Sequence, residues 1–327
     1  MYRGKVLLLY ISTFTLILLI FSYSTLNGNK VTILNSANAI SSTPSPSSPH
    51  SQSSNSPSSC PPCAIFRIDD ISDNHASSSI AVMNLFIAEH EPITLGIVMN
   101  HIGRNPALME KILDGLDKGL FELALHGYDH LYYTKLSPQE QLDQLSYANQ
   151  RMRDLFGKPS NVFIPPYDFF NKYTIGAMTK LGIKIISAGD WDYSVKFGNS
   201  QYNIFHANDV VIGKDNNNNN NNNNSSKAHN TNQVIHIPRD TGFESFDAPQ
   251  PILLPTGKIL NDTISHIQKF GYSVIVMHPT SFLKMQNGKN TKTVDENEIN
   301  HLKTLIESVK SKNIHITSFS NLAIPVR

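Results

Sequence analysis

The sequence predicts an α/β fold, either a βα barrel or an open doubly wound sheet, and two observations lead to it. Short apolar runs of strand length alternate with segments of helical period across residues 64–327. The chain has 327 residues, of which 40% are hydrophobic and 16% charged, which is enough to bury one large core. In both folds parallel strands end at a common edge, so we expect the chemistry at their C-terminal ends.

The strands of this fold are expected at the apolar runs. In chain order these are AIFRI (64–68), ITLGIVM (93–99), FELALH (121–126), NVFIPP (161–166), IKIIS (183–187), VIHIP (234–238), YSVIVMHP (272–279) and IHITSF (314–319). Seven or eight strands that alternate with helices are typical of a parallel sheet covered by helices.

One intervening helix carries signals for both of its ends. Ser137 is a suitable N-cap, and Pro138 suits the first helical position. Glu140, three residues after the cap, completes a capping box, and Gly157 is a suitable stop. The sequence therefore predicts a helix between Ser137 and Gly157.

Residues 1–26 are typical of a membrane anchor or a signal segment. Arg3 and Lys5 precede an uncharged apolar stretch, 6–23, of roughly the length that crosses a bilayer as a helix. The small residues at 37–39 resemble a cleavage site, which leaves a secreted form as the alternative, although they lie far beyond the apolar stretch. We expect a single-pass protein of the cell membrane, and both interpretations place the folded part outside the cytoplasm.

Two segments lack the composition of a packed core. Residues 27–62 are rich in serine and proline and are expected to form an extended linker. Residues 215–232 contain a run of asparagines and are expected to be a loop insertion. The insertion interrupts the domain to which we assign residues 63–327.

The charge balance and the cysteines exclude two classes of function. Lys and Arg total 27 against 26 for Asp and Glu, so a nucleic-acid partner is not expected. The two cysteines, Cys60 and Cys63, lie at the edge of the linker, and no strand precedes them as it would in a redox motif. We expect them to form a local disulfide or to remain two idle thiols.

Carboxylates and imidazoles gather at the ends of two predicted strands. Asp69 and Asp70 end the first, and two neighbouring carboxylates at a strand end usually divide their roles or share a cation. His126 and His130 follow the third apolar run, and they face the same way if the chain turns helically after Gly127. Imidazole nitrogens are suitable ligands for zinc and similar divalent ions.

A third strand end adds another histidine. His278 follows the apolar run at 272–277, and its near-neutral titration suits a general acid. Three strand ends of one chain thus carry an aspartate pair, a histidine pair and a single histidine, a combination that chance does not readily produce.

Five motifs resemble those of polysaccharide deacetylases of the carbohydrate esterase family 4 type. They are RIDDI (67–71), HGYDH (126–130), FIPPYD (163–168), GDWDYS (189–194) and VIVMHP (274–279). They occur in the family's order and approximate spacing, and the first, second and fifth are the specific ones. The resemblance, to a divergent branch of the family, covers about residues 64–327 and implies an irregular (β/α) barrel with about seven strands.

The resemblance implies a role for each matching residue. Asp70, His126 and His130 correspond to the ligands of a divalent metal ion, which we expect to be Zn²⁺. Asp69 corresponds to the catalytic base.

The remaining catalytic positions follow from the third and fifth motifs. The backbone N–H near Tyr167 corresponds to a donor for the tetrahedral oxyanion. His278 corresponds to the acid that protonates the departing amine.

The third motif departs from the family. The family usually has an arginine that pairs with the base aspartate, whereas Ile164 stands at that place here. Arg67 is the first candidate to replace it, because residues two apart on a strand point to one face and Arg67 is two before Asp69. Arg239 is the second candidate.

The fourth motif leaves its roles open. Trp191 is a candidate wall for the acetyl pocket or a core residue. Asp190 or Asp192 is a candidate partner that orients His278. Three tyrosines in and after the second motif are candidates for stacking on sugars, although packing explains them equally: Tyr128, Tyr132 and Tyr133.

These observations predict a metal-dependent hydrolase that removes N-acetyl groups from an extracellular or cell-surface polysaccharide. The expected partner is therefore an N-acetylated glycan. The alternatives are a catalytically inactive carbohydrate-binding barrel and a deacylase of a different amide or ester. A metalloprotease is disfavoured, because the chain lacks the H-E-x-x-H motif.

Overall fold

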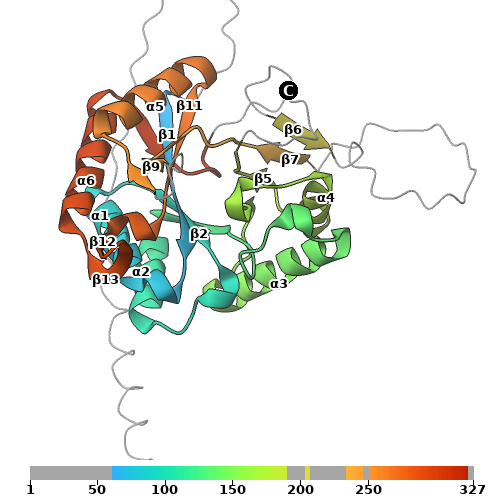
Figure 1. Cartoon of the computed structure of the whole chain (residues 1–327). Helices are drawn as coiled ribbons and strands as arrows, with labels where there is room; N and C mark the ends of the chain where they lie inside the picture. The colour runs from blue at the N-terminus through green and yellow to red at the C-terminus, as the bar shows by residue number, and fades with distance from the viewer. Residues whose placement is uncertain (1–60, 190–202, 207–232, 246–250, 323–327) are drawn as a thin grey trace, which may run out of the picture. The chain divides into compact units, whose positions relative to one another are not determined.

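The computed structural model describes residues 61–189, 203–206, 233–245 and 251–322. All of them belong to one compact unit, residues 56–327. The main element is a ten-stranded sheet in which β6, β7, β5, β4, β3, β2, β1, β11 and β8 are neighbours in this order, with β14 also paired to β1. Every pairing in the sheet is parallel except that of β6 with β7 (Figure 1).

All eight strands that were predicted from the apolar runs are present. They are β1 (Cys63–Ile71), β2 (Ile93–Ile97), β3 (Phe121–Leu125), β4 (Val162–Phe163), β5 (Ile185–Ile186), β7 (Gln233–His236), β11 (Tyr272–Met277) and β14 (His315–Thr317). The sheet also contains the shorter strands β6 (Asn203–His206) and β8 (Thr241–Gly242). β6 and β8 end the path of strands without pairing to each other in the described part of the chain.

The sheet curls, so the fold is the irregular barrel and not the open doubly wound sheet. Ile65 on β1 and Ile185 on β5 belong to one buried apolar cluster, although β2, β3 and β4 lie between these two strands in the sheet. The side chain of Arg67 on β1 also hydrogen-bonds to Ser187 after β5, which it can reach only if the sheet bends around this cluster. We call this cluster the barrel interior.

The two faces of β1 show which residues the curl turns inward. Cys63 and Ile65 belong to the barrel interior, whereas Ala64, Phe66 and Ile68 belong to the larger cluster beneath the helices. Side chains alternate between the faces of a strand. Arg67 and Asp69 therefore continue the inward face.

Six helices cover the outer face of the sheet (Figure 1). They are α1 (Ala76–Glu89), α2 (Pro106–Asp117), α3 (Pro138–Phe156), α4 (Lys172–Leu181), α5 (Thr256–Phe270) and α6 (Glu296–Ser311). Five short 3₁₀ helices lie in the connections: η1 (Asp73–His75), η2 (Met99–His101), η3 (Tyr133–Lys135), η4 (Pro166–Asp168) and η5 (Pro279–Phe282).

Helix α3 has the two ends that its sequence predicts. The Ser137 hydroxyl accepts a hydrogen bond from the Glu140 N–H at 3.3 Å, and the Glu140 carboxylate accepts one from the Ser137 N–H at 2.7 Å. Gly157 ends the helix with φ 77°, a left-handed value that favours glycine. The predicted capping box and stop are confirmed.

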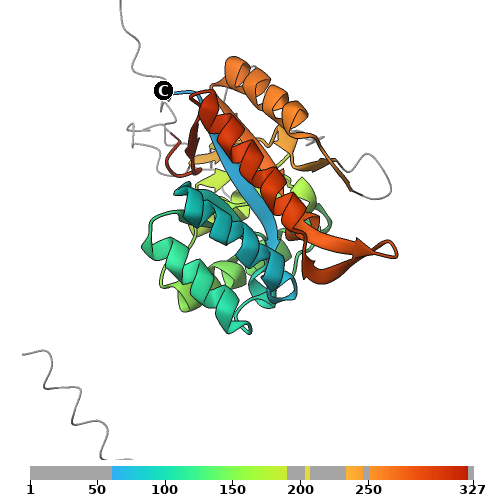
Figure 2. The ribbon, with the colours of Figure 1, turned by 90° about the vertical axis from the view of Figure 1, so that its left-hand side faces the viewer.

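Two small antiparallel pairs complete the described structure. β9 (Glu244–Ser245) pairs with β10 (Ile252–Leu253), and β12 (Leu283–Gln286) pairs with β13 (Lys289–Val294). The β12–β13 hairpin extends beyond the helices in Figure 2.

Several expectations fall on residues outside the described ranges. They concern the anchor or signal segment at 1–26, the insertion at 215–232, and Cys60. Among the described helices, none has the length and apolar content needed to cross a membrane. Cys63 is buried at the start of β1, where its thiol donates to the Gly271 carbonyl at 3.7 Å.

Candidate active site and metal centre

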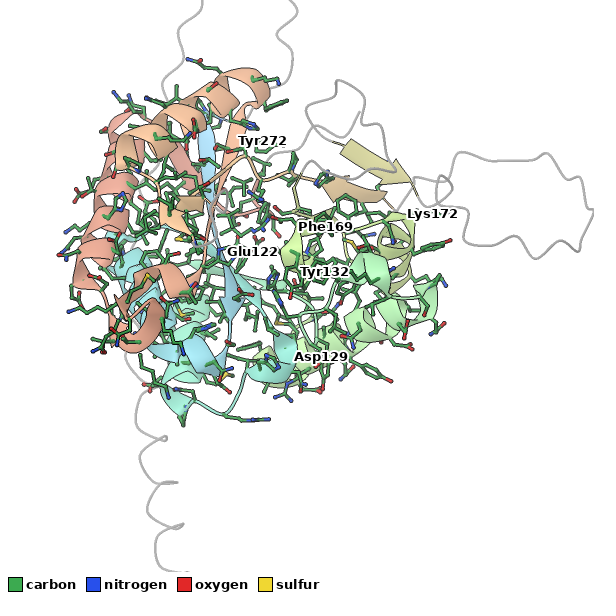
Figure 3. All side chains as sticks on the ribbon, in the orientation of Figure 1. Glu122, Asp129, Tyr132, Phe169, Lys172 and Tyr272 are labelled. Carbon is green, nitrogen blue, oxygen red and sulfur yellow. The ribbon has the colours of Figure 1, made fainter. Side chains whose placement is uncertain are left out.

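The candidate residues meet at the C-terminal ends of the parallel strands, as expected for this fold. Asp69 and Asp70 lie near the end of β1, His126 follows β3, and His278 follows β11. In Figure 3, Asp129 of the loop after β3 lies toward the opposite end of the sheet from Tyr272, the first residue of β11.

A bulge in β1 brings both carboxylates to the site. The register between β1 and β2 shifts between Ile68 and Ile71, and Asp70 between them has φ 58°. In a regular strand Asp69 and Asp70 would point to opposite faces, but a bulge turns one extra residue out of the alternation. The left-handed backbone of Asp70 therefore turns its carboxylate toward the histidines.

Asp70, His126 and His130 form a compact group of ligand atoms. Asp70 Oδ1 lies 3.3 Å from His126 Nε2 and 2.9 Å from His130 Nε2. One ligand atom from each of the three residues lies within 4.8 Å of the others, and the two imidazole rings are 4.9 Å apart between centroids. Two imidazoles and one carboxylate are a donor set that zinc and similar ions accept, and they leave positions open for water and substrate.

The hydrogen bonds around His126 suit a ligand. His126 Nδ1 lies 2.8 Å from the Ile164 carbonyl oxygen, which can only accept. Nδ1 therefore carries the proton, and the Nε2 lone pair is directed toward Asp70 and His130. This carbonyl is the kind of outer partner that fixes the tautomer of a metal-binding histidine.

The electrostatics of the group favour a positive charge. Burial on its own would raise the pKa of Asp70, but the imidazoles of His126 and His130, 3.3 Å and 2.9 Å from its Oδ1, outweigh burial and lower the pKa. Burial likewise would lower the pKa of His126, but the carboxylates of Asp69 and Asp70 raise it. The same negative field favours a bound cation.

We had expected His126 and His130 to face the same way if the chain turned helically after Gly127. They do come together, but the loop between them is not helical. Gly127 has φ 79° and His130 has φ 55°, both left-handed. Asp129 holds the loop, because its carboxylate accepts hydrogen bonds from Asn100 Nδ2 at 2.7 Å and Gln144 Nε2 at 3.2 Å. The loop is thus set by contacts with η2 and α3 rather than by a local helix.

Asp69 pairs with Arg67, the first of the two candidates for the missing arginine. Arg67 Nε lies 2.9 Å from Asp69 Oδ1, and its NH2 lies 2.7 Å from Asp69 Oδ2. Arg67 is fully buried, and its remaining donors reach the Ser187 carbonyl, the Ser187 hydroxyl and Asp168 Oδ1. Burial would lower the pKa of Arg67, but Asp69 and Asp168 raise it, so the guanidinium stays charged.

The arrangement leaves no need for an arginine at position 164. Ile164 is buried, and a Cβ added at Gly96 of β2 would lie 3.3 Å from Ile164 Cδ1 and 3.1 Å from Asp69 Oδ1. Glycine at 96 therefore permits the close approach of Asp69 and Ile164 to β2. Arg239, the second candidate, pairs with Asp168 instead of Asp69.

His278 has a partner that sequence reasoning missed. Its Nδ1 bonds to Glu244 Oε1, and the other oxygen of Glu244 accepts from the Ser281 hydroxyl at 2.8 Å. Burial would lower the pKa of His278, but Glu244, with smaller contributions from Asp69 and Asp70, raises it to about 9. This value lies above the near-neutral pKa that the sequence suggested for His278.

Glu244 lies outside the five motifs, which explains why it was missed. The earlier candidates for its role, Asp190 and Asp192, lie outside the described residues, as does Trp191. The only signal in the sequence was an acidic residue in the segment 239–271, between the predicted strands at 234–238 and 272–279.

Tyr167, a residue of η4, lies beside the metal-ligand group. Its ring centroid is 4.7 Å from that of His130, and its backbone has φ 62° and ψ 12°. Tyr132 stacks on it with ring centroids 3.7 Å apart and an interplanar angle of 6°. Tyr132 and Phe169, labelled in Figure 3, have ring centroids 6.2 Å apart, and together with Tyr167 they form what we call the aromatic wall.

The other two tyrosines of the second motif pack within the protein. Tyr133 is fully buried and contacts Phe163, with ring centroids 4.9 Å apart. Tyr128 packs near Tyr147, with centroids 6.1 Å apart. Of the three candidates for sugar stacking, only Tyr132 lies in the aromatic wall.

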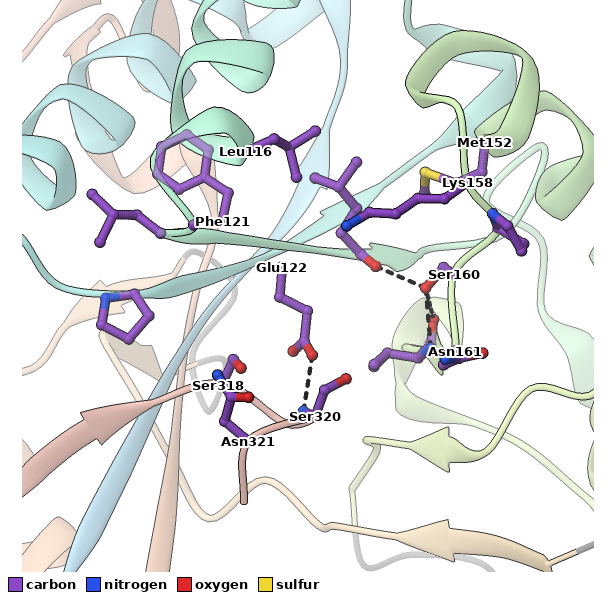
Figure 4. Close-up of a pocket in the computed structure, with 16 residues that line it drawn as sticks. Leu116, Phe121, Glu122, Met152, Lys158, Ser160, Asn161, Ser318, Ser320 and Asn321 are labelled. Atoms are coloured by element: carbon purple, nitrogen blue, oxygen red, sulfur yellow. Dashed lines mark hydrogen bonds between the residues drawn. The ribbon is translucent and has the colours of Figure 1, made fainter. Parts of the chain in front are cut away.

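A separate pocket lies at the opposite ends of the strands (Figure 4). It has a volume of about 310 Å³ and is lined in part by Phe121 at the start of β3 and Val162 at the start of β4. Glu122 at its centre accepts hydrogen bonds from Thr94 Oγ1 and from the N–H groups of Phe319 and Ser320. It includes none of the candidate catalytic or metal-binding residues.

The chain is similar in fold to a putative polysaccharide deacetylase from Mycobacterium smegmatis, with a TM-score of 0.51 at 14% identity over 82% of this chain and 91% of that one. Two further similar structures are a family 4 carbohydrate esterase from Streptomyces lividans in complex with acetate (TM-score 0.44, 15% identity, 79% and 93% covered) and a CE4 family pseudoenzyme from Bacillus anthracis (TM-score 0.47, 14% identity, 80% and 65% covered). No curated protein sequence matches the chain.

The family model for polysaccharide deacetylases matches residues 59–186. This segment contains the aspartate pair of β1, both histidines of the metal-ligand group and Tyr167. Over this segment, the chain matches the polysaccharide deacetylase family.

Proposed function

We propose that this protein is a metal-dependent hydrolase that removes N-acetyl groups from an extracellular or cell-surface polysaccharide. The observation that carries the proposal is that three groups of interacting side chains lie together at one end of the barrel. They are the metal-ligand group around Asp70, the Arg67–Asp69 pair and the Glu244–His278 pair. The match of residues 59–186 to the polysaccharide deacetylase family supports deacetylation as the chemistry.

Asp70, His126 and His130 would hold the metal ion, for which we propose Zn²⁺. The donor set and the hydrogen bond from His126 to the Ile164 carbonyl fit such an ion. A divalent ion in this position supplies Lewis acidity, which lowers the pKa of water from about 16 toward about 7 and polarises a carbonyl group.

Asp69 would take the proton of the attacking water. Its carboxylate is buried and is held in place by two hydrogen bonds from the guanidinium of Arg67, and a carboxylate is a suitable proton acceptor. As the water oxygen bonds to the acetyl carbon, this proton passes to Asp69. The backbone N–H near Tyr167 would stabilise the negative charge that develops on the carbonyl oxygen.

His278 would supply the proton that the leaving nitrogen needs. An amine is a poor leaving group unless it is protonated while the carbon–nitrogen bond breaks. Glu244 keeps the pKa of His278 at about 9, so the ring carries a proton to donate at neutral pH. The products are acetate and a sugar with a free amine.

The aromatic wall supports a carbohydrate as the substrate. Tyr132 and Tyr167 are partly exposed beside the metal-ligand group, and exposed aromatic faces are suited to contact with sugar rings. Of the two residues, Tyr167 is the more exposed, at 45% against 36% for Tyr132.

The proposed location follows from the sequence. Residues 1–26 would anchor the chain in the cell membrane, and the linker at 27–62 would hold the catalytic domain outside the cytoplasm. A secreted form is the alternative if the segment is cleaved.

Of the two alternatives, the inactive carbohydrate-binding barrel loses its main support. That alternative rested on the missing arginine at position 164, and Arg67 now supplies a guanidinium to Asp69 from β1. A deacylase of another amide or ester would use the same residues, and the choice of substrate in the assay separates it.

The test uses the full-length chain in detergent. Elemental analysis is expected to find about one divalent ion per chain, and acetate release is expected from chitooligosaccharides or peptidoglycan fragments assayed with zinc, cobalt, nickel and iron in turn. His126→Ala should lose both the ion and the release while the chain stays folded. A wild-type chain that binds these glycans and the ion yet releases no acetate would contradict the proposal.

A further inference from the structure

Asp168 has no role in the chemistry proposed above, yet it lies between the two arginines of the site. Its Oδ1 accepts from Arg67 NH2 at 2.8 Å, and its Oδ2 pairs with Arg239 Nε. The Asp168 side chain is 13% exposed, and that of Arg67 is 1% exposed. Burial would raise the pKa of Asp168, but Arg67 and Arg239 lower it, so the carboxylate remains charged.

One nitrogen atom joins Asp168 to Asp69. Arg67 NH2 lies 2.7 Å from Asp69 Oδ2 and 2.8 Å from Asp168 Oδ1. The four side chains therefore form a chain of alternating charge that runs from Asp69 through Arg67 and Asp168 to Arg239. Because bidentate and charge-assisted bonds are strongly directional, the position of Asp168 is coupled to that of Asp69.

The backbone at Asp168 is the second observation. Tyr167 and Asp168 are consecutive residues with φ 62° and φ 61°, in the left-handed region that non-glycine residues seldom adopt. Aspartate tolerates this conformation better than tyrosine does. Contacts on the side chain of Asp168 must therefore hold the segment in place, and the two arginines provide them.

We propose that Asp168 is a positioning residue, whose carboxylate fixes the left-handed segment Tyr167–Asp168 to the guanidinium that also holds Asp69. The oxyanion donor near Tyr167 and the base thus keep a set position relative to each other. The inference rests on the proposed function for its catalytic meaning. The coupling itself is a property of the fold, which can be measured without a substrate.

The test compares Asp168→Asn, Asp168→Gly and the control Asp240→Asn in the full-length protein loaded with zinc. Asparagine keeps the shape and tolerates positive φ but removes the charge, and glycine adopts positive φ freely but removes both contacts. Asp240 is also a buried carboxylate, and it follows Arg239 directly. Its side chain bonds to the Ser273 hydroxyl, the Val274 N–H and His266 instead of to the arginines, so its variant tests the loss of a nearby buried charge that is not part of the chain from Asp69 to Arg239.

We expect kcat for acetate release from chitooligosaccharide to fall about tenfold in Asp168→Asn and about 100-fold in Asp168→Gly, with KM within about twofold of wild type. The control should keep kcat within about twofold. If Asp168 served only to permit the left-handed backbone, Asp168→Gly would retain the wild-type kcat, and that result would overturn the proposal.

Hydrogen exchange separates this inference from the proposed function. Amides in residues 164–171 should exchange faster in both Asp168 variants and at the wild-type rate in Asp240→Asn. If wild type releases no acetate but the exchange differs in this way, the deacetylase proposal fails and the coupling stands. Unchanged exchange in both Asp168 variants would overturn the coupling.

Discussion

Arg67 is a charged residue in a place that would be very costly without its partners. It is fully buried, and each of its N–H groups has an acceptor among Asp69, Asp168 and Ser187. Removal of one partner from a buried ion pair leaves the other charge uncompensated, which costs several kcal/mol. A substitution of Arg67 is therefore expected to affect both the stability of the fold and the proposed role of Asp69.

Arg67→Met is therefore expected to lower the free energy of unfolding by about 3–5 kcal/mol. It is also expected to lower kcat on the order of 100-fold, because Asp69 loses the bidentate contact that orients its carboxylate. Urea unfolding and steady-state kinetics measure the two effects. The double variant Arg67→Met with Ile164→Arg should recover part of both, since Ile164 lies beside Asp69 across Gly96.

A methionine variant with the kcat and pH profile of wild type would show that Arg67 does not tune the base. Arg67→Lys serves as a second variant where methionine prevents folding. It keeps the charge but not the bidentate geometry, so an intermediate kcat is expected.

Glu244→Gln is expected to move the alkaline limb of the kcat profile to lower pH. Glu244 is the largest of the charges that raise the pKa of His278 to about 9, and without it the pKa falls toward its ordinary value of 6.5. At pH 8 a histidine of ordinary pKa is only about 3% protonated, so kcat there should fall roughly 30-fold. At pH 6 the two proteins should differ little.

The same pair links stability to pH. A histidine whose pKa is raised on folding stabilises the native state below the unfolded pKa of about 6.5, and this contribution is lost as pH rises through about 9. Wild type should therefore lose stability between pH 6.5 and pH 9 more than Glu244→Gln does. If the alkaline limb of the kcat profile lay at the same pH in wild type and in Glu244→Gln, another group would be the acid.

At the scale of elements, β1 carries the largest difference between expectation and structure. The period-2 alternation of β1 predicted correctly that Arg67 and Asp69 share a face. It could not predict the bulge that turns Asp70 to the same site, because a bulge depends on the register with β2 and not on the residues of β1 alone.

The loops after the strands were predictable in composition but not in conformation. His126 and His130 were found by their residue types, whereas the left-handed backbone at Gly127 and His130 depends on contacts of Asp129 with other elements. Glu244 was missed for a similar reason, since only the pairing of β8 with β11 brings it beside His278. Local signals such as the α3 capping box were predicted in full.

Gly96→Ala tests how closely β2 approaches the base. The new Cβ would lie 3.1 Å from Asp69 Oδ1, which is shorter than an ordinary contact, so Asp69 would have to shift. We expect a loss of about 1 kcal/mol in stability and a fall of about tenfold in kcat. Thermal unfolding and kinetics measure both.

Gly257→Ala in α5 is the matched control for this substitution. Nothing lies within 4 Å of a Cβ at that position, so alanine should leave kcat unchanged and stabilise the protein by up to about 1 kcal/mol. If Gly96→Ala behaved like this control, the contact between β2 and Asp69 would be of no consequence.

At the scale of the whole molecule, the curl of the sheet decides the fold. The sequence left a barrel and an open sheet as equal candidates from its strand pattern, and the resemblance favoured the barrel. Arg67 settles the matter physically, because its side chain on β1 reaches Ser187 after β5, on the far side of the interior. Strand patterns alone do not encode which strands face each other across an interior.

Metal binding is expected to stabilise the whole domain, because the ligands come from the ends of β1 and β3. An ion at about 100 times its Kd adds roughly 2.7 kcal/mol to the free energy of unfolding. Thermal unfolding should therefore occur at higher temperature with zinc than with a chelator. His130→Ala should show no difference between the two conditions, and an equal shift in that variant would place the ion elsewhere.

The direction of β1 has a consequence for how a tethered enzyme would work. The chain enters the sheet at Cys63 and reaches Asp69 six residues later, about 20 Å farther along the strand. A tether that precedes Cys63 would thus join the barrel at the N-terminal end of β1, which is the end opposite to the candidate active site. A polysaccharide would then reach the site from the side that faces away from the attachment point. The length of the tether would set how far the domain reaches, and it would not change the geometry of the site.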